Sequence, residues 1–454
     1  MTIPPAPLVR SVPEDVSAFL AEHPDLDTLE VVLPDINSVL RGKWMPGAAV
    51  TKVFESGVAF PFSLFGLDVW GREVEETGLH IETGDKDGVC WPVDGSLTMV
   101  PYAERKTAQL LLSMAAPDGT PFEIDPRVAL TRIVDRLADM GLTANAAFEL
   151  EFYLFEDPGR AGEEPKPVFW TERGPSRQNM YALSDLESLT PLIDELRRSA
   201  EAQGIAADAA VSEAAPGQFE LNLHYRDDPL RAADDAVLLR RLVTGVARRH
   251  GLTASFMAKP FAEWPGNGMH VHVSFVGKDG NIFAGDDGET RLGHAVNGLL
   301  ETMPDALLLF ISTFNGFRRL QPGSYAPTSV CWGYDNRSVA VRIPAASEQA
   351  RRIEHRIAGA DANPYLVLIG VLAGMMHGLD KKKAPPPPVA GNAYDRNMKV
   401  LSPWMDEVID AFEVSDFMKE AAGGELHRVL TAIKREELAA FGREISALER
   451  ETYL

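Results

Sequence analysis

The chain has 454 residues, of which 45% are hydrophobic and 24% charged, as in a folded globular protein long enough for two cores. Its net charge of −22 argues against binding to nucleic acid or to anionic membranes, because phosphate groups would be repelled. Two cysteines exclude a disulfide framework and favour a reducing compartment. The longest apolar run, residues 364–376, is too short to cross a bilayer. We therefore expect a cytoplasmic protein that binds neither nucleic acid nor membrane.

The first part of the chain, residues 1–103, has the pattern of a small mixed domain. Two short runs, 31–33 and 38–44, flank a Pro-Asp-Ile-Asn turn and predict a β-hairpin. A helix is predicted over 46–56. The loop that follows, 57–71, is rich in Phe and Gly but has no periodicity. We expect this loop to be ordered by packing against another surface, such as a neighbouring subunit.

The longer region, residues 104–454, alternates between strand and helix patterns. Asp125-Pro126 predicts a helix start, because Asp caps free backbone N–H groups and Pro suits the first helical position. Along the strand predicted over 146–155, Phe and Leu lie on one side, and two glutamates lie on the other. Further helices are predicted over 189–203, 227–250 and 291–314 and from residue 364, and further strands over 218–225, 270–275 and 338–343.

Polar side chains with metal-binding chemistry recur on several of these segments. One strand carries two acids on the same face, another segment carries two more, and a Gly-rich loop leads into a His-x-His pair. Alone, such an acid pair usually marks a solvated edge, and such a histidine pair is usually hydrogen-bonded on a sheet. Acids that are buried together repel and need metals, arginines or protons. Several such sets together indicate one site, made of Glu149, Glu151, Glu213, Glu220, His270, His272 and Glu354.

The ligand chemistry of this set favours two divalent sites. Five carboxylates and one imidazole suit Mg²⁺ or Mn²⁺ better than Zn²⁺. Several arginines in the segments from residue 319 to residue 356 suit phosphate and carboxylate groups, because the planar guanidinium can form two parallel hydrogen bonds. Metals and arginines around one cavity imply phosphoryl transfer. These arginines are Arg319, Arg337, Arg342, Arg352 and Arg356.

Motifs occur along the chain in the order FELEF, SEAAPGQFELNL, KPFAEWPGNGMHVHVS, RRLQPGSYAP, NRSVAVRIP and RRIEHRIAGADANPY. Their combination resembles the glutamine synthetase family over essentially the whole chain. The resemblance implies an α+β fold, with a small N-terminal β-grasp domain (1–103) and a large catalytic domain (104–454) of curved antiparallel sheet and flanking helices. It also implies a homododecamer with active sites between subunits, and ATP with two to three Mg²⁺ (or Mn²⁺) as cofactors.

The resemblance assigns roles residue by residue. A first metal is matched by Glu151, Glu213 and Glu220, and a second by Glu149, His270 and Glu354. Nucleotide and phosphate contacts are matched by His272, Ser274, Tyr225, Arg342 and Arg352. Arg337 matches an arginine near the transferred phosphate, Arg319 and Arg356 match those that hold glutamate, and Gly266 matches a backbone contact to it. Strand alternation places Tyr225 opposite Glu220, which speaks against its match to an adenine contact.

Two acids that hold ammonium in ordinary glutamine synthetases are missing here. Tyr325 stands at the Glu position of the flap, and Pro61 stands near the Asp position of the loop from the neighbouring subunit, with Ser63 within the uncertainty of the register. Ammonium must be desolvated and deprotonated, so ammonia use should be crippled. An alkylamine would suit a channel with apolar and cation–π contacts better. The candidates to line this channel are Phe60, Phe62, Phe65 and Tyr325.

These departures favour the branch of the family that forms γ-glutamylamides. The expected reaction joins the γ-carboxylate of glutamate to a primary amine, such as putrescine, through γ-glutamyl phosphate. The alternatives are a γ-glutamylethanolamide synthetase, an ammonia-using glutamine synthetase and a catalytically silent structural or binding homologue. A polyamine needs a distal acid, for which Glu73, Glu75, Glu76 and Glu82 are candidates, although such a run is usually a solvated face. Tyr394 stands where some family members carry an adenylylated tyrosine, but its surroundings match poorly.

Overall fold

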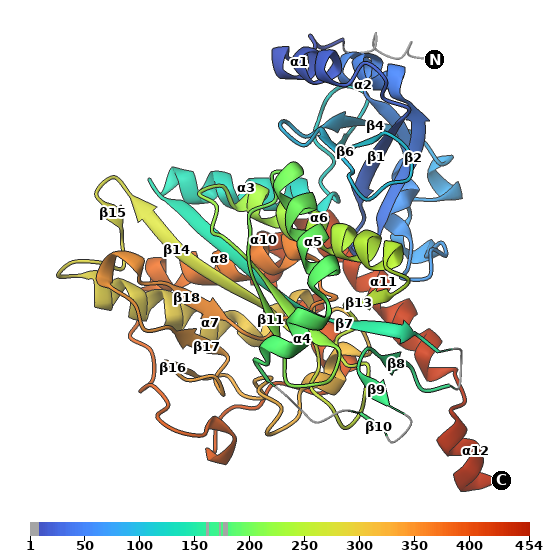
Figure 1. Ribbon diagram of the computed structural model, residues 1–454. Helices are drawn as coiled ribbons and strands as arrows, with labels where there is room; N and C mark the ends of the chain where they lie inside the picture. Colours follow the sequence, from blue (N-terminus) through green and yellow to red (C-terminus); the bar gives the residue numbers. More distant parts are fainter. Residues whose placement is uncertain (1–8, 160–162, 172–173, 176–179) are drawn as a thin grey trace.

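The computed structural model describes residues 9–159, 163–171, 174–175 and 180–454. Two lobes are visible in Figure 1, a smaller one made from the start of the chain and a larger one that holds the remaining strands and most of the helices. The fold is therefore α+β, as the sequence predicts. The last helix projects away from the body of the larger lobe and carries the C-terminus.

The N-terminal lobe is built on a six-stranded sheet in the order β2-β1-β6-β4-β3, with β5 on β6. β1 pairs antiparallel with β2, which confirms the predicted hairpin, and parallel with β6, as in a β-grasp. The division at residue 103 stays a prediction, but β6 lies beyond it and completes this sheet. The elements are α1 (Glu14–Glu22), β1 (Thr28–Pro34), β2 (Leu40–Pro46), α2 (Val50–Ser56), β3 (Val58–Pro61), β4 (Asp87–Pro92), β5 (Thr98–Met99) and β6 (Thr107–Ala115).

The larger lobe contains a ten-stranded sheet in the order β11-β12-β7-β14-β18-β17-β16, with three short strands beside this path. Its named pairs are antiparallel except β16 with β17. The strands are β7 (Thr143–Asp157), β8 (Lys166–Pro167), β11 (Ala207–Ser212), β12 (Gln218–Leu223), β13 (Thr253–Ser255), β14 (Met269–Gly277), β15 (Gly280–Asn281), β16 (Trp332–Tyr334), β17 (Val341–Ile343) and β18 (Ile353–His355). A separate pair is formed by β9 (Trp170–Thr171) and β10 (Gly174–Pro175).

Helices cover the apolar side of this sheet. Phe148, Leu150 and Phe152 on β7 are at most 1% exposed, and α3 and α6 pack against this strand. The polar side of β7 is therefore left for the site. The helices are α3 (Pro126–Asp139), α4 (Leu183–Ser188), α5 (Thr190–Ala202), α6 (Pro229–Arg249), α7 (Gly288–Phe310), α8 (Pro364–Lys381), α9 (Met405–Val414), α10 (Asp416–Ala422), α11 (Gly424–Gly442) and α12 (Ala447–Tyr453).

Sequence signals for helix starts are realised at α3 and α8. Asp125 Oδ1 accepts a hydrogen bond from the Arg127 N–H at 2.8 Å, and Pro126 follows as the first helical residue. Asn363 caps α8 in the same way, with Pro364 at its first position. The apolar run of α8 is buried as predicted. Within the described part of the chain, no helix combines the length and the hydropathy that a membrane span requires.

The turn between β1 and β2 ties the two lobes together. Asn363 Nδ2 donates to the carbonyl oxygens of Asp35 and Ile36, each at 3.1 Å. The turn predicted from Pro-Asp-Ile-Asn therefore has partners in the larger lobe, which hold it in place.

Candidate active site

The strand register aligns polar side chains across one face of the large sheet. Glu151 on β7 lies opposite Glu220 on β12, and Glu149 lies opposite His270 on β14. Side chains directly opposite each other on neighbouring strands point to the same face. Antiparallel pairing thus brings together acids and an imidazole that are far apart in the sequence.

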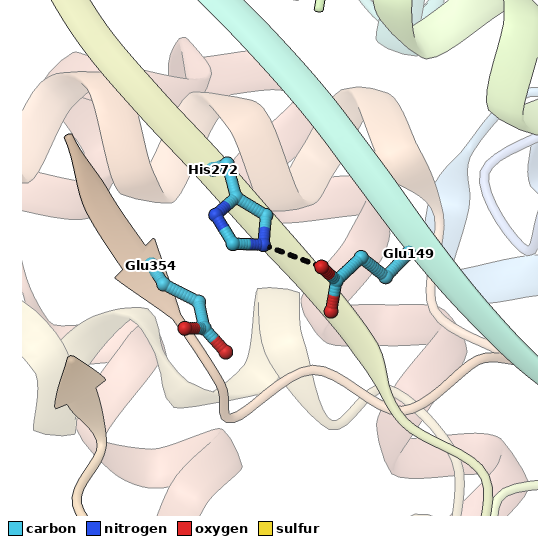
Figure 2. Close-up of side chains that lie close together, drawn as sticks. All are labelled: Glu149, His272 and Glu354. Atoms are coloured by element: carbon cyan, nitrogen blue, oxygen red, sulfur yellow. Dashed lines mark hydrogen bonds and ion pairs between the residues drawn. The ribbon is translucent and has the colours of Figure 1, made fainter. Parts of the chain in front are cut away.

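The row continues to β18, where Glu354 lies opposite His272. Figure 2 shows His272 facing the Glu149 carboxylate, with Glu354 beside them. His272 Nε2 lies 2.9 Å from Glu149 Oε1, and His270 Nδ1 lies 3.1 Å from Glu149 Oε2. Burial opposes ionisation of Glu149, but these hydrogen bonds outweigh it and hold its pKa well below the ordinary range. The ionised form of Glu149 is therefore favoured, and its two oxygens face the two imidazoles.

Three further carboxylates form an acid cluster, which consists of Glu151, Glu213 and Glu220. One oxygen from each lies within 4.8 Å of the others. Burial, followed by the charge of Glu151, raises the pKa of both Glu213 and Glu220 above the ordinary range. The Glu151 carboxylate also accepts a 2.6 Å hydrogen bond from the Gly268 N–H. A divalent cation would relieve this repulsion, and the all-oxygen donor set fits Mg²⁺ or Mn²⁺.

The second predicted metal set is only partly assembled. Glu149 and His270 are grouped with Glu220, whereas Glu354 is grouped with Glu149 and His272. The Glu354 carboxylate accepts hydrogen bonds from Arg342, at 2.8 Å, and from Arg356. Burial opposes its ionisation, but the charge of Arg356 and its other positive neighbours lowers its pKa. The assignment of this metal stays a prediction, because Glu354 is held by arginines.

A cavity of about 510 Å³ opens beside the row of imidazoles. Tyr225, His272, Ser274 and Arg352 all line it, so four of the five predicted nucleotide contacts share one cavity. Arg352 Nε donates to His272 Nδ1 at 3.2 Å. The objection to Tyr225 from strand alternation was wrong, because β12 ends at Leu223 and the alternation stops there. The fifth, Arg342, lies on the neighbouring β17 and pairs with Glu354.

Both arginines predicted to hold glutamate are buried. Arg319 and Arg356 are 4% and 6% exposed, and Arg319 Nη1 donates to the Ile357 carbonyl at 2.9 Å. A Cβ atom on Gly266 would lie 2.6 Å from Arg319 Cγ, and one on Gly268 would lie 3.0 Å from its Nη2. These glycines therefore let the loop pack closely on Arg319, and the contact of Gly266 with glutamate stays a prediction.

Arg337 and Tyr325 lie in the loops around this site. Arg337 Nη1 donates to the Tyr181 hydroxyl at 3.1 Å. Tyr325 is 62% exposed and has a positive φ of 57°. Their roles as the phosphate and flap residues stay predictions.

The predicted contributors from loop 57–71 lie in the other lobe of the same chain. Pro61 ends β3, and Ser63 is buried in the short helical turn that follows. Their contribution to the amine end of a site in a neighbouring subunit stays a prediction.

The prediction that Phe60 and Phe65 line an amine channel was wrong. Phe60 is 4% exposed and Phe65 is fully buried, so both are core residues of the N-terminal lobe. Phe65 packs on Phe122 with ring centroids 5.6 Å apart. Phe62 also packs on Phe122, at 4.5 Å, but remains partly exposed. Core packing, rather than a channel, explains the aromatic content of this loop. The four candidate distal acids, Glu73, Glu75, Glu76 and Glu82, are exposed on the same lobe.

Two side chains with no predicted role support the loop before β14. Gln218 Nε2 donates to the Gly266 carbonyl at 3.1 Å, and the Tyr153 hydroxyl donates to the Pro265 carbonyl at 2.8 Å. Asn222 lies opposite Glu149. The signal for Gln218 and Asn222 was in the sequence, since both share the strand face of Glu220.

Carboxylates, imidazoles and arginines lie together on one face of a mostly antiparallel sheet. This combination places the site in the class of metal-dependent phosphoryl-transfer sites. The family model for the glutamine synthetase catalytic domain matches residues 123–453. This chain belongs to the glutamine synthetase family.

Curated relatives match nearly the full length. The chain is 38% identical to gamma-glutamylputrescine synthetase PuuA of Escherichia coli strain K12, over 97% of this chain and 94% of that one. It is 32% identical to glutamate–isopropylamine ligase of a Pseudomonas species, over 89% of each chain. It is 30% identical to gamma-glutamylethanolamide synthetase GlnA4 of Streptomyces coelicolor, over 96% and 94%. The solved structure of a GmaS/ADP complex superposes with a TM-score of 0.84 at 26% identity, covering 97% of this chain and 99% of that one.

Proposed function

We propose that this protein is an ATP-dependent ligase that joins the γ-carboxylate of glutamate to a primary amine, with a polyamine such as putrescine as its amine. The observation that carries the proposal is the convergence of Glu149, Glu151, Glu213, Glu220 and His270 on one sheet face. The flap adds support, because Tyr325 stands at the position where the resemblance implies an ammonium-binding acid in ordinary glutamine synthetases. Three relatives named as ligases of glutamate with larger amines support the same reading.

The proposed chemistry proceeds in two balanced steps. A γ-carboxylate oxygen of glutamate attacks the terminal phosphorus of ATP, and the bond to ADP breaks. The amine nitrogen then attacks the carbonyl carbon of γ-glutamyl phosphate, inorganic phosphate leaves, and the nitrogen loses a proton. Splitting amide formation in this way replaces a poor leaving group with phosphate.

The residues of this chain would bind and orient the reactants. Arg319 and Arg356 would hold glutamate, and Arg337 would stabilise charge on the transferred phosphate through its planar guanidinium. The acid cluster and the row of Glu149 and the imidazoles would hold two to three Mg²⁺ or Mn²⁺. When bound, these ions would neutralise the phosphates of ATP.

We further propose that ATP binds in the 510 Å³ cavity beside His272, with the Tyr225 ring against adenine. Ser274, Arg342 and Arg352 would contact the nucleotide and its phosphates. A homododecamer, with Pro61 and Ser63 from a neighbouring subunit at the amine end, remains the expected assembly.

The test is phosphate release with ATP, Mg²⁺ and glutamate against ammonium, putrescine, spermidine and ethanolamine. We expect a polyamine to give the highest kcat/KM and ammonium the lowest. Ethanolamine as the best substrate would move the protein to the ethanolamide branch, and ammonium as the best would make it a glutamine synthetase. A folded, metal-binding protein that releases no phosphate with any amine would support the silent homologue.

A further inference from the structure

A short segment, residues 389–395, is fastened at one end to the turn that carries Arg337. Asn336 Nδ2 donates to the carbonyl oxygens of Val389, at 3.1 Å, and Gly391, at 2.8 Å. Ser338 Oγ accepts a hydrogen bond from the Ala393 N–H at 3.0 Å. Arg337 lies between these two anchoring residues, so the segment and the arginine share one rigid turn.

The other end of this segment is fastened to the flap, residues 320–327. The Tyr394 hydroxyl donates to the carbonyl oxygen of Ala326 at 2.9 Å. Ala326 directly follows Tyr325, whose φ of 57° is in the left-handed region. This conformation is unfavourable for a tyrosine, which keeps it only when neighbouring contacts fix the backbone. The hydrogen bond from Tyr394 is such a fixing contact.

The surroundings of Tyr394 connect it to the substrate end of the site. Its ring is half-buried, and Arg319, Arg356 and Tyr325 lie close enough to act on its hydroxyl electrostatically. Burial raises the pKa of Tyr394 to about 12, so the hydroxyl remains a hydrogen-bond donor at neutral pH. A hydroxyl engaged in this way serves the flap backbone and is not presented as a free acceptor for modification.

We propose that Tyr394 is a positioning residue that holds the flap, with Tyr325, over the reacting γ-carboxyl group and couples the flap to the turn of Arg337. The inference rests on the proposed ligase function. A flap held in this way shields the acyl phosphate until the amine attacks. When the flap is loose, a water oxygen attacks the same carbonyl carbon instead, loses a proton as phosphate leaves, and regenerates glutamate, so ATP is consumed without amide formation.

The test variant is Tyr394→Phe, which removes the hydroxyl and keeps the ring. We expect the KM for the amine to rise roughly fivefold, the effect of one lost neutral hydrogen bond, with the KM for ATP unchanged. The ratio of phosphate released to amide formed should also rise above that of the wild type. Hydrogen exchange of peptides from residues 320–327 should become faster, while peptides from β7 keep their protection.

Tyr453→Phe is the matched control, because Tyr453 is 82% exposed near the C-terminus. It should leave unchanged the ratio of phosphate released to amide formed and the KM values for the amine and for ATP. A Tyr394→Phe protein with the wild-type ratio of phosphate to amide and the wild-type rate of hydrogen exchange in residues 320–327 would overturn the inference. An equal rise in the KM values for ATP, glutamate and amine, together with a lower Tm, would also overturn the inference and would indicate a purely structural role.

The wild-type enzyme in the same assay separates the two proposals. If the wild type forms amide and the Tyr394→Phe protein behaves as the wild type does, only the role of Tyr394 is overturned. No amide product from the folded wild type with any amine overturns the ligase function, and the role of Tyr394 with it. Ser338→Ala, which frees the other end of the segment, should raise the same phosphate-to-amide ratio if the turn and the flap are coupled.

Discussion

At the scale of single residues, the acid cluster of Glu151, Glu213 and Glu220 is the most informative feature of the site. Its members are partly or fully buried and lie too close for all three to be ionised comfortably. Burial and like charge raise the pKa of Glu213 and Glu220, whereas hydrogen-bonded histidines lower that of Glu149. Carboxylates of two kinds therefore lie side by side. The ionised form is favoured at Glu149, whereas Glu213 and Glu220 would ionise more readily beside a bound cation.

Replacing Glu220 with Gln should remove repulsion and a metal ligand together. We expect the Tm of the metal-free Glu220→Gln protein to be at least that of the wild type, because a neutral amide replaces a carboxyl group whose ionisation is opposed by burial and like charge. The rise in Tm on adding Mn²⁺ should shrink, and metal-dependent phosphate release should fall at least about 100-fold. Thermal unfolding with and without Mn²⁺ measures the first two effects.

Glu156→Gln is the control for this substitution, since Glu156 lies exposed near the end of β7, the strand that pairs with the Glu220 strand β12. It should keep the wild-type response to Mn²⁺. A Glu220→Gln protein that is stabilised by Mn²⁺ as strongly as the wild type would contradict the assignment of Glu220 as a ligand.

Metal binding should release protons at neutral pH. An ordinary glutamate, with a pKa of about 4.3, is already ionised there, but the raised pKa values of Glu213 and Glu220 leave part of these groups protonated. Because only the carboxylate binds the ion, affinity should rise as pH increases through the raised pKa of Glu213, about 7. Calorimetry of Mg²⁺ binding in two buffers with different ionisation enthalpies measures the protons released. Identical heats in both buffers would contradict the prediction.

At the scale of elements, α11 fastens the N-terminal lobe to the larger one through a buried ion pair. Lys434 Nζ lies 2.8 Å from Glu437 Oε2, and their side chains are 1% and 3% exposed. Glu437 Oε1 accepts a hydrogen bond from the Val69 N–H at 2.9 Å, and Lys434 also donates to Asn37. The pair thus holds loop 57–71 and the β1–β2 turn on one helix.

Lys434→Met should leave Glu437 charged, buried and without its cation. We expect a loss of about 3–5 kcal/mol in the free energy of unfolding, the range seen when one partner of a buried pair is removed. The double variant Lys434→Met/Glu437→Gln should recover part of that loss. Denaturant unfolding measures both, with Lys278→Met, at a 91% exposed side chain, as the control. A single variant no less stable than this control would refute the role of the pair.

At the scale of the whole molecule, the net charge of −22 bears on how the amine arrives. An acidic protein attracts cations over distances set by the Debye length, about 10 Å at 0.1 M salt. A diamine carries two positive charges at neutral pH and a simple alkylamine carries one.

The logarithm of kcat/KM for putrescine should therefore fall with ionic strength about twice as steeply as that for butylamine. Steady-state rates between low and moderate salt measure both slopes. ATP and glutamate are held at saturation so that only the amine step is compared. Equal slopes would show that the acidic surface contributes solubility and no steering.

Much of the fold could be predicted because it is written in local patterns. The caps Asp125 and Asn363 and the buried run of α8 follow from backbone chemistry and hydropathy that act over a few residues. The polar face of β7 was predictable for the same reason, since strand alternation needs no partner. The objection to Tyr225 was wrong because strand alternation ends where the strand ends. The channel predicted from the aromatic loop was wrong because composition does not reveal which phenylalanines pack inward.

The sequence by itself determined the family and the metal-binding types of residue on the strand faces, because these depend on which residue types occur and in what order. Only the tertiary structure decided which ligands meet. The register of four strands sets Glu151 against Glu220 and His272 against Glu354, and it leaves Glu354 to two arginines. Pairing between segments far apart in the chain is a sum of many small long-range contacts, and no local pattern encodes that sum.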